Sequence, residues 1–432
     1  MKSESQVIVR PARNLRGSVN LPGDKSISHR YAMLAAIAEG PSRLENYSTG
    51  ADCASTLGCL QSLGAKWART DGSSNVIEVQ GSGPSLAAPS ESLDCGNSGS
   101  TIRMLSGIVA AQKFTTEMAG DESLSRRPME RVIAPLTAMG AQITSQDGRP
   151  PLCIQGTDLK GIDYQMPVAS AQVKTCLLFA GLLAEGETRI EEPLRTRDHG
   201  EVALRAFGAH LDRKKNEVTI RGGQRLQGIE ARIPGDLSSA AFFLCAAALF
   251  PDSQLTIPAL LMNPTRARLL DILTQMGVRI SVTQLEEMHG EPVGTLQVAG
   301  GRLKGATIGG ADAAALIDEI PVLAAIAPYT EQGIEIRDAK ELRVKESDRI
   351  ASIATNLRAM GAQVEEREDG LKIPGQQTMQ GAEVESFGDH RIAMAFSIAA
   401  LRAQGDTLIR GSESAAISYP VFFSTLEGLL ER

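Results

Sequence analysis

Six stretches of the chain are apolar on nearly all sides and rich in Ala and Leu. They span residues 25–38, 98–111, 170–184, 238–250, 318–327 and 390–403. A helix without a polar face is typical of a protein core, so the pattern predicts six buried helices. The longest apolar run, at 240–250, is far shorter than the ~18 residues that a membrane-spanning helix requires. We therefore expect a core helix there and no membrane segment.

Five other segments alternate with these helices, and each has the same plan. A helix-like run ends in a hydrophobic residue, a glycine follows, and a strand-like stretch begins after a small residue. The segments are 57–67, 134–143, 203–211, 271–280 and 355–364, with Gly64, Gly140, Gly208, Gly277 and Gly361 as their glycines. A glycine just past a helix can adopt the left-handed conformation that ends the helix. Their spacing exceeds any solenoid period and predicts a series of small α/β modules.

Buried helices in every module predict cores in which helices lie inside and sheet lies outside, the reverse of a TIM barrel. Six modules around two cores give three modules per domain. Turn signals at Pro22-Gly23 and at Gly235-Asp236 mark the places where the chain is expected to cross between domains.

The amino-acid composition indicates a globular protein and excludes several other classes. The chain has 432 residues, of which 42% are apolar and 22% charged, which is typical of a globular protein and not of a disordered or collagen-like chain. Its net charge of −7 provides no general attraction for nucleic acid, so any anion site must be a local group of Arg and Lys. Six cysteines without a C-x-x-C spacing favour reduced structural thiols. The polar first twenty residues resemble no targeting signal, so we expect a cytoplasmic protein.

The starts of the predicted core helices carry the chemistry. In PGDKSISHR, at 22–30, a helix start combines Lys25, Ser26 and Arg30 with free backbone N–H groups, which suits a phosphate or carboxylate. One such start is more often only a capped, solvated helix end. The same combination returns at 96–101, followed by Arg103, and at 169–172 and 388–391. This recurrence predicts that the helix starts converge on one anion-binding cleft.

Several carboxylates are candidates for proton transfer. Asp318 and Glu319 precede a buried helix, and Glu346 lies between Lys345 and Arg349. Acids at a helix start are usually N-caps. In a closed cleft they become candidate general acids or bases, because burial and nearby cations shift a carboxyl pKa. His390 could equally be a core histidine.

The motifs together resemble the 5-enolpyruvylshikimate-3-phosphate synthase family of enolpyruvyl transferases, over essentially the whole chain and in the family's order. They are PGDKSISHR at 22–30, GNSGST at 96–101, SRRPM at 125–129, SAQVK at 170–174, RVKESDRI at 343–350 and GDHRIAM at 388–394. The resemblance implies a two-domain inside-out α/β barrel built from six βαβαββ units, three per domain. It implies a discontinuous first domain, 1–23 plus 236–432, a second domain, 24–235, and an active site in the cleft between them.

The resemblance also implies the reaction. The enolpyruvyl group of phosphoenolpyruvate passes to the 5-hydroxyl of shikimate 3-phosphate by addition and elimination, with release of phosphate, as a step of aromatic amino acid biosynthesis. No metal or other cofactor is implied, because protein cations neutralise the two anionic substrates. The expected partners are these two small molecules, with no nucleic acid and no membrane, and the expected state is a monomer.

The family's site residues transfer to matching positions of this chain. The implied catalytic residues are Lys25, Asp318 and Glu346. The residues implied for shikimate 3-phosphate are Lys25, Ser26, Arg30, Ser170, Ala171, Gln172, Arg197, Asp318 and Lys345. The residues implied for phosphoenolpyruvate are Lys25, Gly99, Arg127, Gln172, Arg349, His390 and Arg391.

Some positions depart from the family pattern. Ala171 replaces a hydroxyl of many members, Glu341 stands where some have Asn, and Ile417 stands where one branch has a phosphate-binding Lys. An alternative is the sister enzyme that acts on UDP-N-acetylglucosamine, but its lid loop carries a reactive cysteine and 118–130 here has none. An RNA-end-processing or non-catalytic member of the same repeat fold is a further alternative, against which the acidic net charge weighs.

Overall fold

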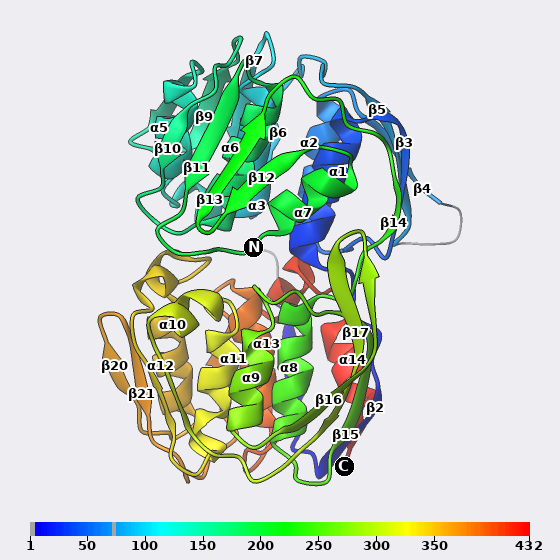
Figure 1. Cartoon of the computed structure of the whole chain (residues 1–432). Helices are drawn as coiled ribbons and strands as arrows, with labels where there is room; N and C mark the ends of the chain where they lie inside the picture. Colours follow the sequence, from blue (N-terminus) through cyan, green and yellow to red (C-terminus); the bar gives the residue numbers. More distant parts are fainter. Residues whose placement is uncertain (1–4, 71–74) are drawn as a thin grey trace. The chain divides into compact units, whose positions relative to one another are not determined.

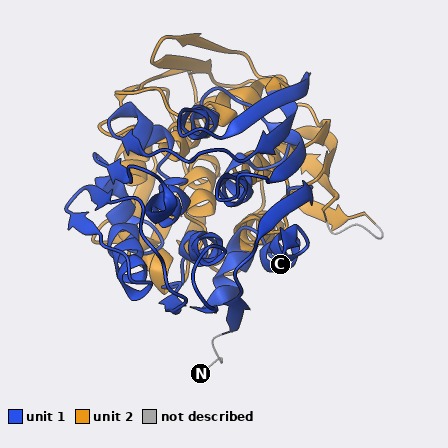
Figure 2. Cartoon of the chain, turned by 90° about the horizontal axis from the view of Figure 1, so that it is seen from below, with its two compact units in different colours: residues 1–22, 234–287, 292–432 blue, residues 23–233, 288–291 orange. Residues whose placement is uncertain are grey.

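The computed structural model describes residues 5–70 and 75–432, which form two compact units (Figure 2). Unit 1 comprises residues 1–22, 234–287 and 292–432, and unit 2 comprises residues 23–233 and 288–291. The first four residues of the expected first domain lie outside the described residues. The chain passes from unit 1 to unit 2 at Pro22-Gly23 and returns at Ile233-Pro234.

Two modules of unit 2 follow the predicted βαβαββ order. The first consists of β6 (Leu93–Asp94), α3 (Gly99–Val109), β7 (Thr115–Ala119), the short α4 (Glu122–Ser125), α5 (Glu130–Ala138), β8 (Gln142–Gln146) and β9 (Arg149–Gln155). The second consists of β10 (Asp163–Gln165), α6 (Ala171–Leu183), β11 (Glu187–Glu191), α7 (His199–Ala206), β12 (Leu211–Lys214) and β13 (Glu217–Arg221). Their sheets have the orders β6-β7-β9-β8 and β10-β11-β13-β12. In both, the two strands that flank the buried helix are parallel.

The third module of unit 2 is completed by a strand from far along the chain. It contains α1 (Lys25–Ile37), β3 (Glu39–Glu45), α2 (Ala51–Ser62), β4 (Lys66–Arg69), β5 (Ile77–Ser82) and β14 (Glu230–Arg232). Its sheet order is β14-β3-β5-β4, and β14 pairs parallel with β3. In this sheet β14 therefore takes the place that β6 and β10, the first strands of their modules, hold in the other two sheets.

Unit 1 repeats this plan twice. One module contains β2 (Asn14–Ser18), α8 (Leu237–Ala248), β15 (Gln254–Leu261), α9 (Arg268–Gln275), β16 (Arg279–Met288) and β17 (Glu291–Ala299), with β24 (Leu430–Glu431) at the edge beside β2. Another contains β18 (Ala306–Ile308), α10 (Ala311–Ala315), α11 (Ile320–Ile326), β19 (Ile334–Ile336), α12 (Arg349–Ala359), β20 (Glu365–Arg367) and β21 (Gly370–Ile373). Two 3-10 helices, η1 (Ala327–Tyr329) and η2 (Lys340–Val344), flank β19.

The last module differs from the prediction of six complete units. It contains β22 (Glu383–Glu385), α13 (His390–Ala400), β23 (Thr407–Arg410), η3 (Ser412–Ile417) and α14 (Phe422–Glu427). Among the described residues its sheet has the order β1-β23-β22, with β1 (Gln6–Val9) antiparallel to β23. The N-terminal strand thus takes the place of the missing hairpin.

The helices predicted to be buried form the centre of each unit. They are α1, α3 and α6 in unit 2, and α8, α11 and α13 in unit 1. Every residue of α8 is buried, and Figure 1 shows α8, α11 and α13 between the strands of their unit. The prediction of internal helices and external sheet is confirmed. The helix starts differ from the prediction by at most two residues, and the largest difference is at α11, which begins at Ile320 and not at Asp318.

The five predicted glycines lie where the outer helices end. Their φ angles are +87° at Gly64, +112° at Gly140, +91° at Gly208, +98° at Gly277 and +85° at Gly361. Each angle lies in the left-handed region that residues with a Cβ rarely adopt. These glycines terminate α2, α5, α7, α9 and α12 before the next strand begins, as the sequence predicted.

Two further expectations concern residue chemistry. Among the described residues, every helix is too short or too polar to span a lipid bilayer. The six cysteines carry free thiols, and five of them are buried. Burial raises the pKa of Cys53, Cys176 and Cys245, so these thiols stay protonated and unreactive.

A pair of glycine substitutions in unit 2 tests the helix-end argument. We expect Gly208→Ala to destabilise the protein by more than about 1 kcal/mol, because alanine is strained in the left-handed backbone conformation of Gly208. A steric clash would not contribute, since nothing lies within 4 Å of the added Cβ. We expect Gly58→Ala, inside α2, to stabilise by about 0.5–1 kcal/mol, because nothing lies within 4 Å of the added Cβ. Urea unfolding of both variants checks the opposite signs. Equal effects would contradict the assignment of Gly208 as a helix terminator.

Candidate active site

The starts of the three central helices of unit 2 meet at one end of the unit. Arg30 of α1 donates from Nε and Nη2 to Thr175 Oγ1 of α6, at 3.2 and 2.9 Å. Gln172 Nε2 of α6 donates to Ser100 Oγ of α3 at 2.9 Å. Side chains from the first two turns of α1, α3 and α6 are therefore in direct contact.

Short polar side chains cap these helices. Asp24, Ser98 and Ser170 accept hydrogen bonds from the backbone N–H groups of Ile27, Thr101 and Val173, at 2.9, 3.1 and 3.4 Å. Such caps satisfy part of the N–H groups of a first turn, and the helix dipole favours negative charge beside the rest. The predicted polar helix starts are thus present, and three of them lie together.

Lys25 and Ser26 extend this cluster. Lys25 Nζ lies 2.8 Å from Asp52 Oδ2 in the first turn of α2. Arg30 Nη1 donates to the carbonyl oxygen of Ser26 at 2.8 Å, so Arg30 folds back over the start of its own helix. Asp52 was not among the predicted residues, although an acid in the first turn of a helix is a recognisable signal.

Two arginines approach the backbone at Gly99. Arg103 Nη1 donates to Gln172 Oε1 at 2.8 Å, and Arg127 Nη2 donates to Asn97 Oδ1 at 2.7 Å. A Cβ on Gly99 would lie 3.1 Å from Nη1 of each arginine. The absence of a side chain at Gly99 lets both guanidinium groups reach this helix start. Arg103 follows the motif at 96–101 but was not among the predicted site residues.

Arg30 and Arg197 lie close enough to influence each other. Burial, with a smaller contribution from the charge of Arg197, lowers the pKa of Arg30 to about 10, although Asp24 and Glu201 oppose the shift. Arg30 still carries a positive charge at neutral pH. Thr175 Oγ1, its partner, donates to the carbonyl oxygen of Ala171 at 2.8 Å. Unit 2 therefore brings its predicted residues into one cluster: Lys25, Ser26, Arg30, Gly99, Arg127, Ser170, Ala171, Gln172 and Arg197.

The central helix starts of unit 1 also meet at one end. Ser238 Oγ of α8 donates to Glu319 Oε1, immediately before α11. Arg391 Nη1, at the start of α13, donates to the carbonyl oxygen of Asp318 at 2.7 Å and lies 4.0 Å from Glu319 Oε1. Glu319 occupies the N-cap position of α11 but makes no side-chain cap. The interpretation of this acid as an ordinary N-cap is therefore wrong.

Arg349 lies among carboxylates. Its Nε donates to Asp389 Oδ2 at 2.8 Å, its Nη2 donates to Glu346 Oε2 at 2.6 Å, and its Nη1 lies 3.6 Å from Asp318 Oδ1. Burial alone would lower the pKa of Arg349, but the carboxylates, Asp389 first, outweigh it and raise the pKa. Arg349 is 1% exposed, so its position is fixed by these contacts.

Asp318 is shared by two predicted cations. Lys345 Nζ lies 3.8 Å from the same Asp318 Oδ1 that faces Arg349. Burial lowers the pKa of Lys345, and Asp318 opposes this shift. His390 is buried at the first position of α13, with Nδ1 4.0 Å from Asp389 Oδ1. Unit 1 thus gathers its predicted residues as well: Asp318, Lys345, Glu346, Arg349, His390 and Arg391.

Other contacts at these helix starts escaped the sequence analysis. Arg266 Nη2, just before α9, donates to Ser238 Oγ at 2.6 Å. Thr175 holds Arg30, and Gly200 of α7 lies against Thr175, where a Cβ would be 2.6 Å from Thr175 Oγ1. No motif signalled these residues, because their roles depend on a neighbouring helix.

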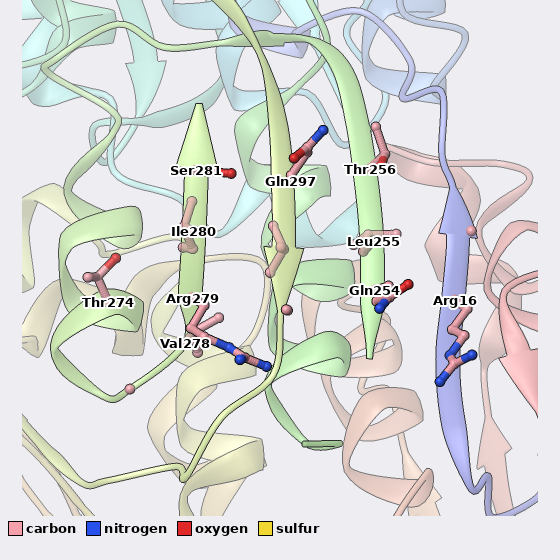
Figure 3. Close-up of a pocket in the computed structure, with 14 residues that line it drawn as sticks. Arg16, Gln254, Leu255, Thr256, Thr274, Val278, Arg279, Ile280, Ser281 and Gln297 are labelled. Carbon is pink, nitrogen blue, oxygen red and sulfur yellow. The ribbon is translucent and has the colours of Figure 1, made fainter. Parts of the chain in front are cut away.

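A cavity of about 1030 Å³ lies elsewhere in unit 1. Figure 3 shows it on the sheet formed by β16, β17, β15 and β2, with Arg16, Gln254, Thr256, Arg279, Ser281 and Gln297 among its lining residues. None of the predicted residues lines it, so this cavity is separate from the two clusters.

His29 lies beneath the unit 2 cluster in a chain of hydroxyl groups. His29 Nδ1 lies 2.7 Å from Thr56 Oγ1, and Thr56 Oγ1 lies 2.7 Å from Thr101 Oγ1. Thr101 Oγ1 donates to Ser98 Oγ at 2.7 Å. This chain joins α1, α2 and α3. Burial, with smaller effects from Lys25 and Arg30, lowers the pKa of His29 well below its usual value.

The lowered pKa of His29 leads us to expect that the stability of the protein depends on pH. Between the folded-state pKa and about 6.5, the unfolded chain binds a proton that the folded protein does not, so acidification favours unfolding by up to ~1.4 kcal/mol per pH unit. We expect His29→Gln to make the loss of stability between pH 7.5 and pH 5 shallower. Urea unfolding across this range measures the slope, with the exposed His210→Gln as control. Parallel curves for wild type and His29→Gln would contradict a neutral buried His29.

Comparison with known proteins covers the whole chain. The family model for EPSP synthase (3-phosphoshikimate 1-carboxyvinyltransferase) matches residues 9–426. The chain is 59% identical to a 3-phosphoshikimate 1-carboxyvinyltransferase of Koribacter versatilis (strain Ellin345), over 99% of both chains. It is 55% identical to the protein with that name in Solibacter usitatus (strain Ellin6076), over 98% of this chain and 99% of the relative.

A solved structure supports the same relation. The EPSP synthase from Acinetobacter baumannii superposes with a TM-score of 0.87 at 41% identity, over 99% of this chain and 98% of that one. The likeness confirms the expected mixed α/β fold class, and the relatives confirm the resemblance that the motifs carry. The chain therefore belongs to the EPSP synthase (3-phosphoshikimate 1-carboxyvinyltransferase) family of enzymes.

Proposed function

We propose that this chain transfers the enolpyruvyl group of phosphoenolpyruvate to the 5-hydroxyl of shikimate 3-phosphate and releases phosphate, as a step of aromatic amino acid biosynthesis. The observation that carries the proposal is the full-length likeness to named 3-phosphoshikimate 1-carboxyvinyltransferases. The geometry supports it, because the predicted motif residues gather in two clusters of cations and carboxylates at helix starts. That chemistry suits two highly charged substrates.

The unit 2 cluster is proposed to bind shikimate 3-phosphate. Ser26 and Arg30 hold its carboxylate, while Ser170, Ala171, Gln172 and Arg197 lie at its phosphate, with Gln172 also over the ring. The support is that the charge of Arg197 acts on Arg30, and Arg30 contacts Thr175 of α6, the helix that Ser170 caps. A helix N-terminus and a guanidinium group both favour a phosphate. Lys25 is placed between the two substrates.

The phosphoenolpyruvate site is proposed to draw on both clusters. Gly99, Arg127 and Gln172 come from unit 2, and Arg349, His390 and Arg391 come from unit 1. Paired hydrogen bonds from planar guanidinium groups match the phosphate and the carboxylate of this substrate. The proposal therefore includes the expected domains, 1–23 plus 236–432 and 24–235, with the active site in the cleft between them. A monomeric state stays a prediction.

Asp318 is the proposed base for the attacking 5-hydroxyl, and Lys345 binds the ring hydroxyls beside it. The hydroxyl oxygen attacks C2 of phosphoenolpyruvate while C3 gains a proton from Glu346 or Lys25. The tetrahedral adduct then loses a proton from C3 and phosphate from C2, which restores the double bond between C2 and C3. Both carboxylates lie beside cations in the structure, Asp318 near Lys345 and Glu346 against Arg349. Such carboxylates can exchange protons once substrates exclude water.

Acceptor choice tests the proposed reaction. With phosphoenolpyruvate as donor, we expect phosphate release with shikimate 3-phosphate and none with UDP-N-acetylglucosamine. The second acceptor represents the sister enzyme that the sequence left as an alternative. Colorimetric measurement of phosphate with each acceptor gives the answer. Release only with the nucleotide sugar, or with neither acceptor, would contradict the proposal.

Two arginine substitutions test whether both clusters serve this reaction. We expect Arg127→Ala in unit 2 and Arg391→Ala in unit 1 each to lower kcat/KM for phosphoenolpyruvate by about 100-fold or more, because each removes a cation that stabilises negative charge. The neighbouring Arg126, whose side chain is 70% exposed, gives the matched control, and Arg126→Ala should stay within about twofold.

Thermal unfolding of each variant checks that the fold is retained. Wild-type activity of Arg391→Ala would exclude Arg391 from the phosphoenolpyruvate site. Wild-type activity of Arg127→Ala would exclude Arg127 in the same way.

A further inference from the structure

Unit 2 contains a group of four charged side chains, three buried and one partly buried, that the proposed reaction does not use. They are Lys174 of α6, Glu192 after β11, Glu201 of α7 and Arg213 of β12, here called the charge quartet. Lys174 Nζ lies 3.1 Å from Glu192 Oε1 and 2.8 Å from Glu201 Oε1. Arg213 contacts the same two carboxylates, with Nη2 2.9 Å from Glu192 Oε2. The side chains of Lys174 and Glu192 are fully buried.

Stability alone is a weak explanation for the charge quartet. Moving charges from water into a core is costly, and apolar replacements of buried ion pairs are often as stable or more so. What such a group does provide is fixed direction, because each carboxylate accepts from two cations at defined angles. The question is which parts of the molecule the charge quartet fixes.

The charge quartet holds the loop 193–198, which carries Arg197. Thr196 donates to Glu192 Oε1 from its backbone N, at 3.1 Å, and from its Oγ1. Thr196 is the immediate neighbour of Arg197. The helix α7 begins at His199, two residues after Arg197. The backbone N of Val202 in α7 donates to the carbonyl oxygen of Asp198 at 3.0 Å, which joins the end of the loop to the helix. Glu192 therefore links the buried ions directly to the segment that orients Arg197.

The charge quartet also fixes the helix that holds Arg30. Lys174 joins α6 to Glu201 of α7, and the next residue, Thr175, is the hydroxyl that Arg30 contacts. Gly200, beside Glu201, approaches Thr175 so closely that a Cβ would lie 2.6 Å from Thr175 Oγ1. A change in the spacing of α6 and α7 would therefore displace the partner of Arg30.

We propose that the charge quartet is a positioning device that orients Arg30 and Arg197 toward the carboxylate and phosphate of shikimate 3-phosphate. The inference rests on the proposed function. Lys174 and Glu192 are positioning residues and touch no substrate. Their effect is specific to one substrate, because the fixed parts are the loop of Arg197 and the α6–α7 contact that holds Arg30.

Thr196→Val tests this link with little risk to the fold. The substitution keeps the side-chain shape and removes only the hydroxyl that donates to Glu192. We expect KM for shikimate 3-phosphate to rise about tenfold, because a lost hydrogen bond to a charged group leaves the loop less fixed. KM for phosphoenolpyruvate and kcat should stay within about twofold. Thr196→Ser, which keeps the hydroxyl, should restore the wild-type KM.

Thr157→Val is the matched control. Thr157 also lies in unit 2 and donates its hydroxyl, at 2.9 Å to the carbonyl oxygen of Gly140, away from the charge quartet. Its removal should leave both KM values unchanged. A second variant, Lys174→Met with Glu192→Gln, removes one charge of each sign and leaves Glu201 paired with Arg213, so the folded core stays neutral. It should raise KM for shikimate 3-phosphate in the same selective way.

The outcomes distinguish failure of the positioning role from failure of the proposed function. An active wild type whose Thr196→Val and double variants change both KM values equally, or neither, overturns the positioning role and leaves the proposed function intact. An equal effect of Thr196→Ser and Thr196→Val also overturns it. A wild type that does not use shikimate 3-phosphate overturns both proposals.

Discussion

A helix that is apolar on all sides must be enclosed on all sides, and this constraint shapes both units. The residues of α8 are all buried, and α1, α3, α6, α11 and α13 are similarly enclosed. Such helices can present polar groups only at their ends. The sheets cover their sides, so the first turns become the places where backbone N–H groups and charged side chains gather. Chemistry at the helix starts is therefore a consequence of the fold.

The two clusters use this arrangement differently. In unit 2, Arg103 and Arg127 donate to the neutral amides Gln172 and Asn97, and Arg30 donates to a hydroxyl. These amide and hydroxyl partners fix the direction of each guanidinium group. In unit 1, Arg349 contacts three carboxylates, and one of them is also close to Lys345. The carboxylates around Arg349 raise its pKa despite its burial, so the guanidinium group stays charged inside unit 1.

The sequence predicted what depends on local pattern. The buried helices follow from runs of Ala and Leu, and the helix ends follow from glycines such as Gly64 and Gly361, whose positive φ needs no long-range information. The strands β1, β2 and β14 complete sheets far from them along the chain, and no local pattern marks such pairings. For the same reason the contacts of Asp52 with Lys25 and of Arg266 with Ser238 were missed, because they form only when two helix starts meet.

Fixing cations before substrates arrive has an electrostatic advantage. Arg349 and Arg30 are nearly fully buried, and each is held by several hydrogen bonds. A mobile surface arginine would lose side-chain entropy on binding an anion, whereas these side chains have already lost it during folding. The cost then falls on the stability of the folded protein, and buried carboxylates such as Asp389 and Glu201 offset part of it. The buried carboxylates thus touch no ligand themselves. They help to hold the arginines in place and charged, so that the arginines can stabilise the negative charge of a ligand.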